Sequence, residues 1–224
     1  MEYPEIEELY NIDDQFLVGA DLLVKPITGS GESSTQVLFP NRDTWYDVDT
    51  MTAIATERTT EELKFSTVTV ESDIDKIPVY QRGGSIIPRK LRLRRSSQMM
   101  THDPYTLYVA LDNEQKASGT IYMDDENTFD HGRKGYYAEA KISVDMNSAT
   151  IQCQVEGTNY EWIASQQVVT RMIERIVIMG LVRAPSQVSV ESTSLEFDYN
   201  GDKGVLVIRK PNVSALGVWK ISIS

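Results

Sequence analysis

Residues 78–88, with the sequence PVYQRGGSIIP, place two short apolar runs on either side of a glycine pair. Val79 and the pair Ile86 and Ile87 are residue types that suit buried β-strands. Gly83 and Gly84 permit a positive φ angle or the close approach of another stretch of backbone. The stretch therefore predicts a corner between two strands, and Pro88 ends the second one.

Short apolar runs bounded by turn residues continue on both sides of this corner, which is the pattern of β-strands. Before the corner they predict strands at 22–24, 36–39, 45–48 and 67–70. After it they predict strands at 107–111, 120–123, 136–144, 150–155, 194–199, 205–208 and 218–223. Strands at this spacing, without long helices between them, favour an all-β fold rather than βαβ units. We expect two consecutive antiparallel β-sandwich domains.

Two segments carry a helical pattern instead. Residues 5–9 follow a proline and begin with acids, which predicts a short helix. Asn11 or Asp13 could cap a second helical turn that holds Phe16 and Leu17 and ends at Gly19. Residues 168–179 fit a helical stripe as well as a strand, and the β-branched density of Ile173 to Met179 favours a strand there.

Composition limits the classes of function. The 224 residues are 41% apolar and carry a formal net charge of −11, which disfavours nucleic acid and other phosphate-rich partners. No apolar run reaches the roughly 18 residues of a membrane span. Cys153, the one cysteine, lies in an apolar–polar alternation and is expected to be buried and unreactive. With only His102 and His131 beside it, a Cys/His zinc site is not credible.

The acidic and basic clusters have ordinary interpretations beside functional ones. Asp124 to Asn127 is interpreted as a solvated loop, with a cation site as the alternative, because the alternating spacing of a calcium loop is missing. Asp13 and Asp14 fit helix caps, and no pair of acids is recommended for glycoside hydrolysis. The basic run Arg89 to Arg95 is expected to be a strand or linker with a solvated basic face. The sequon at Asn212 is a match expected by chance.

Aromatic residues suggest one further site. Trp45, Tyr46 and Trp162 could form a platform on which a sugar ring stacks, although packing inside the core is the more common role of such residues.

Three segments in the same order resemble glycoside hydrolase family 31. They are residues 11–26, residues 45–47 and residues 77–88, and the first resembles the segment through which that family's chain leaves its catalytic barrel. Residues 94–97, 103–111, 124–129 and 173–180 are similar to the branch of the family that removes α-1,3-linked glucose from N-linked glycans. The resemblance covers essentially the whole chain.

The resemblance implies an organisation and a role. It implies a barrel-exit remnant at 1–20, a proximal C-terminal β-sandwich at 21–92 and a distal one at 93–224. The family's catalytic aspartates lie in a (β/α)8 barrel before these segments, so it implies no catalytic, cofactor or metal residue here, and substrate-binding residues stay unknown. For the parent enzyme it implies retaining hydrolysis, the lumen of the endoplasmic reticulum and a non-catalytic β subunit.

Three functions follow as hypotheses: a non-catalytic C-terminal region of an α-glucosidase, a stand-alone carbohydrate-binding module with Trp45 or Trp162 as its platform, and a partner-docking module that uses acidic loops. We also expect Ile6, Leu9, Phe16 and Leu17 to lack the barrel surface that they are built to meet. Deleting residues 1–19 should then improve solubility.

Overall fold

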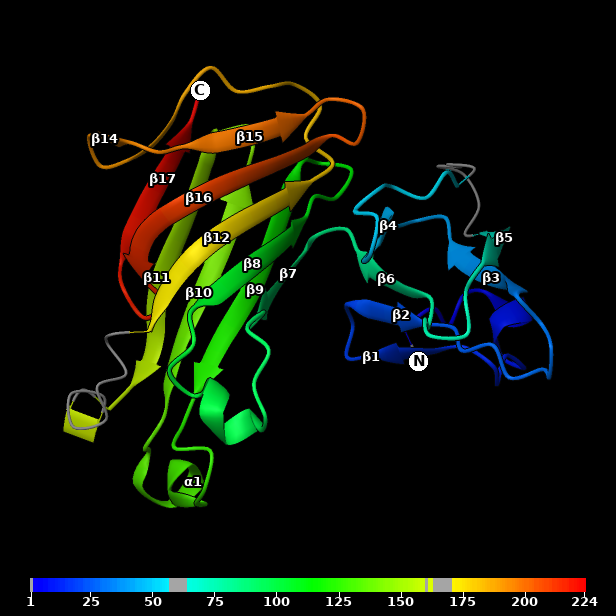
Figure 1. Cartoon of the computed structure of the whole chain (residues 1–224), viewed down its shortest axis with the longest axis horizontal. Helices are drawn as coiled ribbons and strands as arrows, with labels where there is room; N and C mark the ends of the chain where they lie inside the picture. The colour runs from blue at the N-terminus through cyan, green and yellow to red at the C-terminus, as the bar shows by residue number, and fades with distance from the viewer. Residues whose placement is uncertain (1, 57–63, 160, 163–170) are drawn as a thin grey trace.

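The computed structural model describes residues 2–56, 64–159, 161–162 and 171–224, and these residues form three β-sheets (Figure 1). The strands up to the glycine pair are β1 (Phe16–Val18), β2 (Leu22–Val24), β3 (Ser34–Pro40), β4 (Trp45–Asp47), β5 (Phe65–Glu71) and β6 (Val79–Arg82). The strands after it are β7 (Ser85–Arg89), β8 (Tyr105–Ala110), β9 (Lys116–Met123), β10 (Ala138–Asp145), β11 (Thr150–Thr158), β12 (Met172–Met179), β13 (Val188–Val190), β14 (Thr193–Ser194), β15 (Phe197–Asn200), β16 (Val205–Ser214) and β17 (Trp219–Ile223).

Helices are few and short in the described residues. They are the 3-10 helices η1 (Glu7–Leu9) and η2 (Ser97–Met100) and the α-helix α1 (Asp130–Lys134), which ends at Gly135 in the left-handed conformation. Helix α1 lies just after the segment Asp124 to Asn127, which has no helix or strand of its own. None of these helices has the length and apolarity that a membrane crossing requires.

The proximal unit, residues 2–83, consists of a four-stranded sheet in the order β1-β2-β6-β4 and the two-stranded sheet β3-β5. Its core is aromatic, because Phe39, Trp45 and Tyr80 are each at most 2% exposed and the Phe39 and Tyr80 rings meet edge to face at 4.7 Å. The predicted strands at 22–24, 36–39, 45–48 and 67–70 are confirmed, and no bound differs by more than about two residues.

The N-terminal segment differs from its prediction in two ways. The helical turn around Phe16 and Leu17 is wrong: these residues form β1, which pairs antiparallel with β2 so that Phe16 lies opposite Val24. The helix-stop signal at Gly19 is instead the positive φ of +62° in the turn between the two strands.

The apolar residues of this segment are mostly packed within the unit itself. Ile6 is 2% exposed and Tyr3 is 7% exposed, and both belong to the proximal core, with Leu9 and Leu17 packed against it. Phe16, Val18 and Tyr10 are the exceptions, at 53%, 52% and 51% exposure. The expectation that this group lacks a packing surface is therefore wrong for Ile6, because the proximal sheets supply one.

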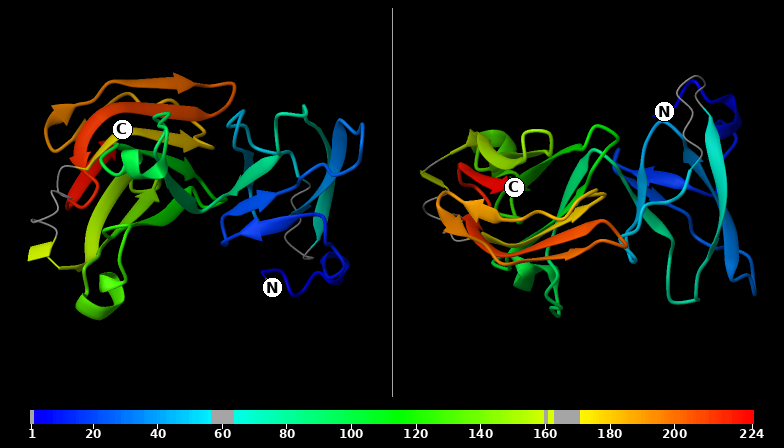
Figure 2. Two further views of the ribbon diagram at one scale, coloured as in Figure 1. Left: turned by 60° about the horizontal axis from the view of Figure 1, so that its bottom comes forward. Right: turned by 90° about the horizontal axis from the view of Figure 1, so that it is seen from above.

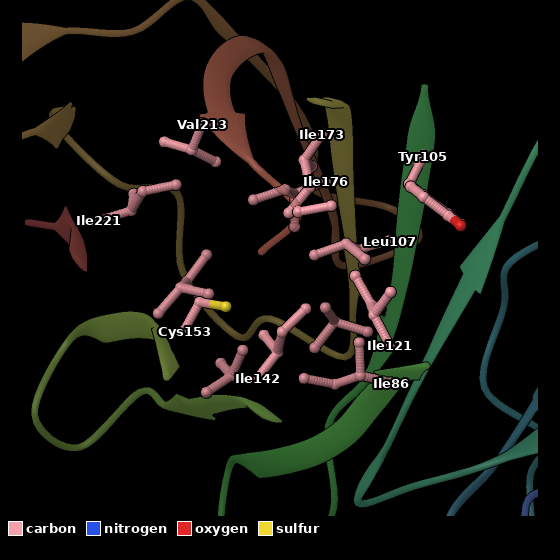
Figure 3. Packing of buried hydrophobic residues seen from close by; sticks show 14 of the residues in the cluster. Ile86, Tyr105, Leu107, Ile121, Ile142, Cys153, Ile173, Ile176, Val213 and Ile221 are labelled. Atoms are coloured by element: carbon pink, nitrogen blue, oxygen red, sulfur yellow. The ribbon is translucent and has the colours of Figure 1, made fainter. Parts of the chain in front are cut away.

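The distal unit, residues 84–224, is one eleven-stranded sheet in the order β14-β13-β17-β11-β10-β9-β7-β8-β12-β16-β15. The sheet folds over on itself into two layers, with β8, β12 and β16 in one and β9, β10 and β11 in the other (Figures 1 and 2). Leu107, Ile173 and Ile176 point toward Ile121, Ile142 and Cys153 across the space between the layers (Figure 3). The predicted all-β sandwich fold is confirmed.

Two strand pairs in the distal unit are parallel, which the sequence did not indicate. They are β8 with β12, along their whole length, and β7 with β9 at one position. The strand prediction for Ile173 to Met179 is confirmed by β12, whose last four residues are all buried. Burial on both faces explains the ambiguity, because a continuous apolar run has no period of two.

The glycine pair is the point at which the chain passes from the proximal sheets to the distal sheet. A Cβ atom on Gly83 would lie 2.9 Å from the Leu111 carbonyl oxygen and 3.1 Å from that of Thr44, and Gly84 has a φ of +90°. Both roles predicted for the pair, close approach and positive φ, are therefore used, one by each glycine. The domain boundary at residues 92 and 93 stays a prediction.

Candidate functional site

The contact between the two units is the most extensively built polar and apolar site in the described residues. Tyr46 of β4 is 3% exposed and packs in a cluster with Ala110, Val177, Met179 and Val205 of the distal unit. Its phenolic oxygen donates a hydrogen bond of 2.7 Å to the Leu111 carbonyl oxygen. A side chain from one unit thus fills a space in the other.

Polar groups around Tyr46 extend this contact. The amide nitrogen of Gln81, a residue only 2% exposed, donates to the Tyr108 carbonyl oxygen at 3.0 Å and to Ser85 Oγ at 3.1 Å. Thr44 Oγ1 donates to Asn113 Oδ1 at 2.8 Å. Because buried polar groups are costly unless they are paired, these bonds fix one arrangement of the two units. We call this contact, which Thr44, Tyr46 and Gln81 make with their distal partners, the junction.

A second cluster attaches the N-terminal segment to the proximal unit through Arg82, the last residue before the glycine pair. Tyr3 Oη donates to Asp43 Oδ2 at 3.0 Å, and Arg82 Nη2 lies 3.1 Å from the same oxygen. The Arg82 guanidinium also lies 5.3 Å from the centre of the Tyr3 ring. Burial, reinforced by the Asp43 carboxylate, raises the pKa of Tyr3 well above its ordinary value, so the phenol stays a donor.

A groove of about 690 Å³ lies beside the junction, and both aliphatic and polar side chains line it, among them Asp47, Asp49, Glu71, Lys76 and Arg89. The carboxylate of Asp47 already accepts hydrogen bonds from the backbone nitrogens of Asp49 and Thr50, at 2.9 and 2.6 Å. In the described part of the chain, no three His, Cys, Asp or Glu side chains are placed to hold a metal ion. The Asp47 carboxylate is therefore already used to hold the turn at residues 47–50.

Neither tryptophan proposed as a sugar platform is available to a ligand. Trp45 is fully buried against Phe39, and its Nε1 donates to the Pro40 carbonyl oxygen at 3.2 Å. Trp162 is 6% exposed and stacks on Tyr136, with the ring centres 6.2 Å apart. The platform hypothesis is wrong for both residues, and the alternative of core packing is right.

The acidic loop Asp124 to Asn127 uses its carboxylates within the protein. Asp125 accepts hydrogen bonds from the backbone nitrogens of Thr128 and Asn127, at 2.9 and 3.1 Å, and from Thr128 Oγ1 at 2.7 Å. The bonds from Thr128 lower the pKa of this carboxyl. Glu126 faces Lys90 and Arg171 at 3.8 and 3.9 Å. The loop is thus an internally bonded turn.

The surroundings of Asp13, Asp14 and Cys153 fit structural roles for these residues. Asp14 forms an ion pair with the buried Lys25, and Asp13 is exposed. Cys153 is 1% exposed, and burial raises its pKa to about 11, so the thiol stays protonated at neutral pH, as the sequence indicated.

The basic run begins with Arg89, the last residue of β7, and continues as a linker in which several charges are paired. Arg94 forms a bidentate pair with Asp103, at 2.7 and 3.0 Å, and Arg92 lies 3.2 Å from Glu174. The guanidinium of Arg89 lies 4.8 Å from the Tyr108 ring centre. The run therefore holds the linker against the distal unit.

One exposed aromatic pair escaped the sequence argument. The rings of Tyr122 and Tyr137 stack with their centres 5.7 Å apart and their planes 19° from parallel, and Tyr122 is 48% exposed. The signal was present, since Tyr122 lies between Ile121 and Met123 in an alternating strand and must point away from their buried side.

Comparison with known proteins agrees with this architecture. Residues 1–87 match the family described as glycosyl hydrolase family 31 C-terminal domain. The chain belongs to glycoside hydrolase family 31, as a C-terminal β-sandwich region.

The more specific likeness is to glucosidase II α-like enzymes. The chain is 36% identical over 219 residues to neutral alpha-glucosidase AB of Dictyostelium discoideum, and the match covers 95% of this chain and 22% of that protein. A crystal structure of the glucosidase II alpha subunit in its alpha3-Glc2-bound form superposes with a TM-score of 0.77 at 30% identity, covering 95% of this chain and 24% of that one.

The glucosidase II heterodimer also contains a matching part. The crystal structure of its catalytic subunit with the binding domain of the regulatory subunit gives a TM-score of 0.77 at 29% identity, over 95% of this chain and 24% of that one. The chain thus spans about a quarter of the length of the relatives it matches. The catalytic (β/α)8 barrel of the family is absent from the described residues.

Proposed function

We propose that this chain is the non-catalytic C-terminal support of an α-glucosidase of the glucosidase II type. In the whole enzyme it would hold the catalytic barrel, which removes α-1,3-linked glucose from N-linked glycans in the lumen of the endoplasmic reticulum. The observation that carries the proposal is the junction. A buried tyrosine and buried hydrogen bonds lock two sandwiches into one arrangement, which suits a rigid support.

The engagement of several carboxylates within the fold supports the same role. A retaining glycosidase needs two carboxyl groups about 5–5.5 Å apart across the sugar. The carboxylates of Asp47 and Asp125 are engaged by turns, and those of Asp14, Asp43 and Asp103 are engaged by cations. We therefore expect the purified chain not to hydrolyse a chromogenic α-glucoside. Turnover that is lost when one of these acids is replaced would overturn the proposal.

A domain exchange tests the support role directly. The corresponding region of Dictyostelium neutral alpha-glucosidase AB would be replaced by this chain, and hydrolysis and thermal inactivation would be measured. We expect an active hybrid, because the match to that protein spans 95% of this chain. The same hybrid with Tyr46→Ala should lose activity at a lower temperature, since the junction is opened. A hybrid that folds but is inactive with the intact junction would contradict the proposal.

Association with a regulatory subunit is a second proposal, which the heterodimer's structural likeness favours. Pull-down of this chain with the binding domain of the regulatory subunit tests it. Capture that is abolished by charge reversal at Glu126 would assign the acidic loop to the contact, and no capture by either the chain or the hybrid would remove the proposal.

A further inference from the structure

The outer face of the β9-β10-β11 layer is solvated and polar, and a half-exposed tyrosine lies at one end of it. Along each of these strands alternate residues are buried in the distal core, and the others point outward. Between the ends of the strands, the outward side chains carry mainly hydroxyl and amide groups: Ser118 and Thr120 on β9, Ser143 on β10, and Gln152 and Gln154 on β11. A polar face of this type can exchange hydrogen bonds with a ligand and carries little net charge.

The strand register places these groups in rows across the sheet. Ser118 lies opposite Ser143, and Ser143 lies opposite Gln152. Thr120 lies opposite Lys141, which lies opposite Gln154 and 4.0 Å from the Glu156 carboxylate. Neighbouring strands are about 4.8 Å apart, so each row presents hydroxyl or amide groups at that interval. The charges on this face come from Lys141, which lies near Glu156, and from Glu139, so the face carries few charges and no excess of cations.

The exposed aromatic pair lies at one end of the same face. Tyr122 is the next outward residue of β9 after Thr120 and lies opposite Glu139 of β10, and its ring stacks on Tyr137. Tyr122 is 48% exposed, so part of its apolar ring surface stays in water beside the half-buried Tyr137, and a ligand could cover it. Over four residues of a strand, the distance from Ser118 to Tyr122 is about 13 Å. Tyrosine rings and hydroxyl or amide groups thus share one side of the sheet over that length.

We propose that this face, from Tyr122 and Tyr137 to Gln152, binds a neutral oligosaccharide. The apolar side of a pyranose would cover the Tyr122 ring, and its hydroxyl groups would exchange hydrogen bonds with Thr120, Ser143 and Gln152. An anionic ligand is disfavoured, because the chain has a net charge of −11 and the face has no excess of cations. The site is separate from Trp45 and Trp162, and it does not depend on the barrel-support proposal.

Nuclear magnetic resonance titration of the whole chain with maltotriose, a neutral gluco-oligosaccharide, tests the proposal. Amide signals of residues 118–122, 139–143 and 152–154 should shift at millimolar sugar. Tyr122→Ala should weaken the dissociation constant about five- to tenfold. Tyr122→Phe should bind as the unmodified chain does, because the ring is kept. Tyr10→Ala is the matched control, since Tyr10 is 51% exposed but lies on the proximal unit.

The possible results separate clearly. Should Tyr122→Ala fail to fold, Gln152→Ala takes its place, because an exposed glutamine on a strand is tolerant of substitution. Amide shifts confined to other residues, such as those that line the groove beside the junction, would overturn the assignment of this face. So would the absence of any shift with maltotriose, or an equal loss of affinity in Tyr122→Ala and Tyr10→Ala. The glycosidase assay tests the support proposal, and its outcome does not depend on this titration.

Discussion

The proximal and distal units bury their apolar residues in different ways. The distal core lies between two layers of one long sheet and is mainly aliphatic, with Ile142, Ile173 and Ile176 almost fully buried. The proximal core is smaller and is centred on Phe39, Trp45 and Tyr80, between a four-stranded sheet and a two-stranded one. Small sheets bury less surface per residue, so the stability of the proximal unit depends on packing contacts with residues outside its sheets.

Two sets of residues supply these additional contacts. The N-terminal segment contributes Tyr3 and Ile6 to the proximal core, and the junction attaches Tyr46 to the distal unit. The distal unit receives Tyr46 as one contact on its surface, while its own core is complete without it. The two units therefore differ in stability. We expect the proximal unit to unfold locally before the distal unit does.

Removal of residues 1–19 should have the largest effect, because it destabilises the proximal unit and leaves the distal unit intact. It deletes Tyr3, Ile6 and the edge strand β1, and it leaves Arg82 and Asp43 without the Tyr3 phenol. Loss of Ile6 burial alone costs about 1.5–3 kcal/mol. We expect hydrogen exchange measured by mass spectrometry to lose protection in β2, β4 and β6 while β10 and β12 keep theirs.

This expectation reverses the one drawn from the sequence, in which the deletion improved solubility. Full protection of β6 in a soluble deletion variant would restore the earlier expectation. It would also show that the N-terminal segment is not needed to close the proximal core. As a control, truncation of residues 1–2 removes Glu2 but leaves Tyr3 and Ile6 in place, so it should change protection little.

Gly180→Ala should open the junction. The added Cβ would lie 2.1 Å from the Tyr46 phenolic oxygen, at a residue whose φ is +87°. We expect unfolding to become easier by about 2–4 kcal/mol, measured by denaturant titration. Gly132→Ala is the matched control, because nothing lies within 4 Å of its Cβ position and it is in α1, so it should be neutral or slightly stabilising.

A double variant separates the two causes. Tyr46→Phe removes the oxygen that the methyl group added by Gly180→Ala would meet, so it should recover part of the loss, while the strain at positive φ remains. If the two substitutions were simply additive, contact between Gly180 and Tyr46 would not be the reason for the glycine.

The sequence predicted most strands of both units for the same physical reasons that form them. Runs such as Leu22 to Val24 and Thr67 to Val70 end at proline, glycine or polar residues, and these signals are local. β1 was missed because three residues before a glycine look the same as the last turn of a helix. Only the partner strand β2 makes Phe16 to Val18 a strand.

The candidate sites were less predictable, because they depend on distant partners. Tyr46 and Leu111 are 65 residues apart in the chain, and no local pattern announces their hydrogen bond. Trp45 looks the same in sequence whether it packs inside the core or faces a sugar. Tyr122 could have been found, since the alternation of its strand already places it on the outer side. The platform prediction considered only that aromatic rings suit a sugar face, whereas the side of the strand on which a ring lies decides whether it is exposed.

Tyr46→Phe alone should have a smaller effect than Gly180→Ala. It removes the 2.7 Å hydrogen bond and leaves the buried Leu111 carbonyl oxygen without that donor, while the ring still fills its place. The expected loss is about 1–2 kcal/mol in the free energy of unfolding. It should appear as faster hydrogen exchange in β4 before β12 is affected. Equal losses of protection in both units would mean that they unfold together.

Arg94→Ala should have the smallest effect and should depend on pH. The hydrogen bonds from Arg94 lower the pKa of Asp103 below its ordinary value, so the pair stabilises the fold above the unfolded pKa near 3.8. That contribution is lost as the pH falls through the lowered pKa. We expect a loss of stability at neutral pH that disappears in acid, with a raised Asp103 pKa measured by nuclear magnetic resonance. Arg92→Ala is the control, because its pair with Glu174 is more exposed and should contribute little. An equal effect of the two substitutions at neutral pH would mean that geometry and burial do not distinguish the ion pairs of this linker.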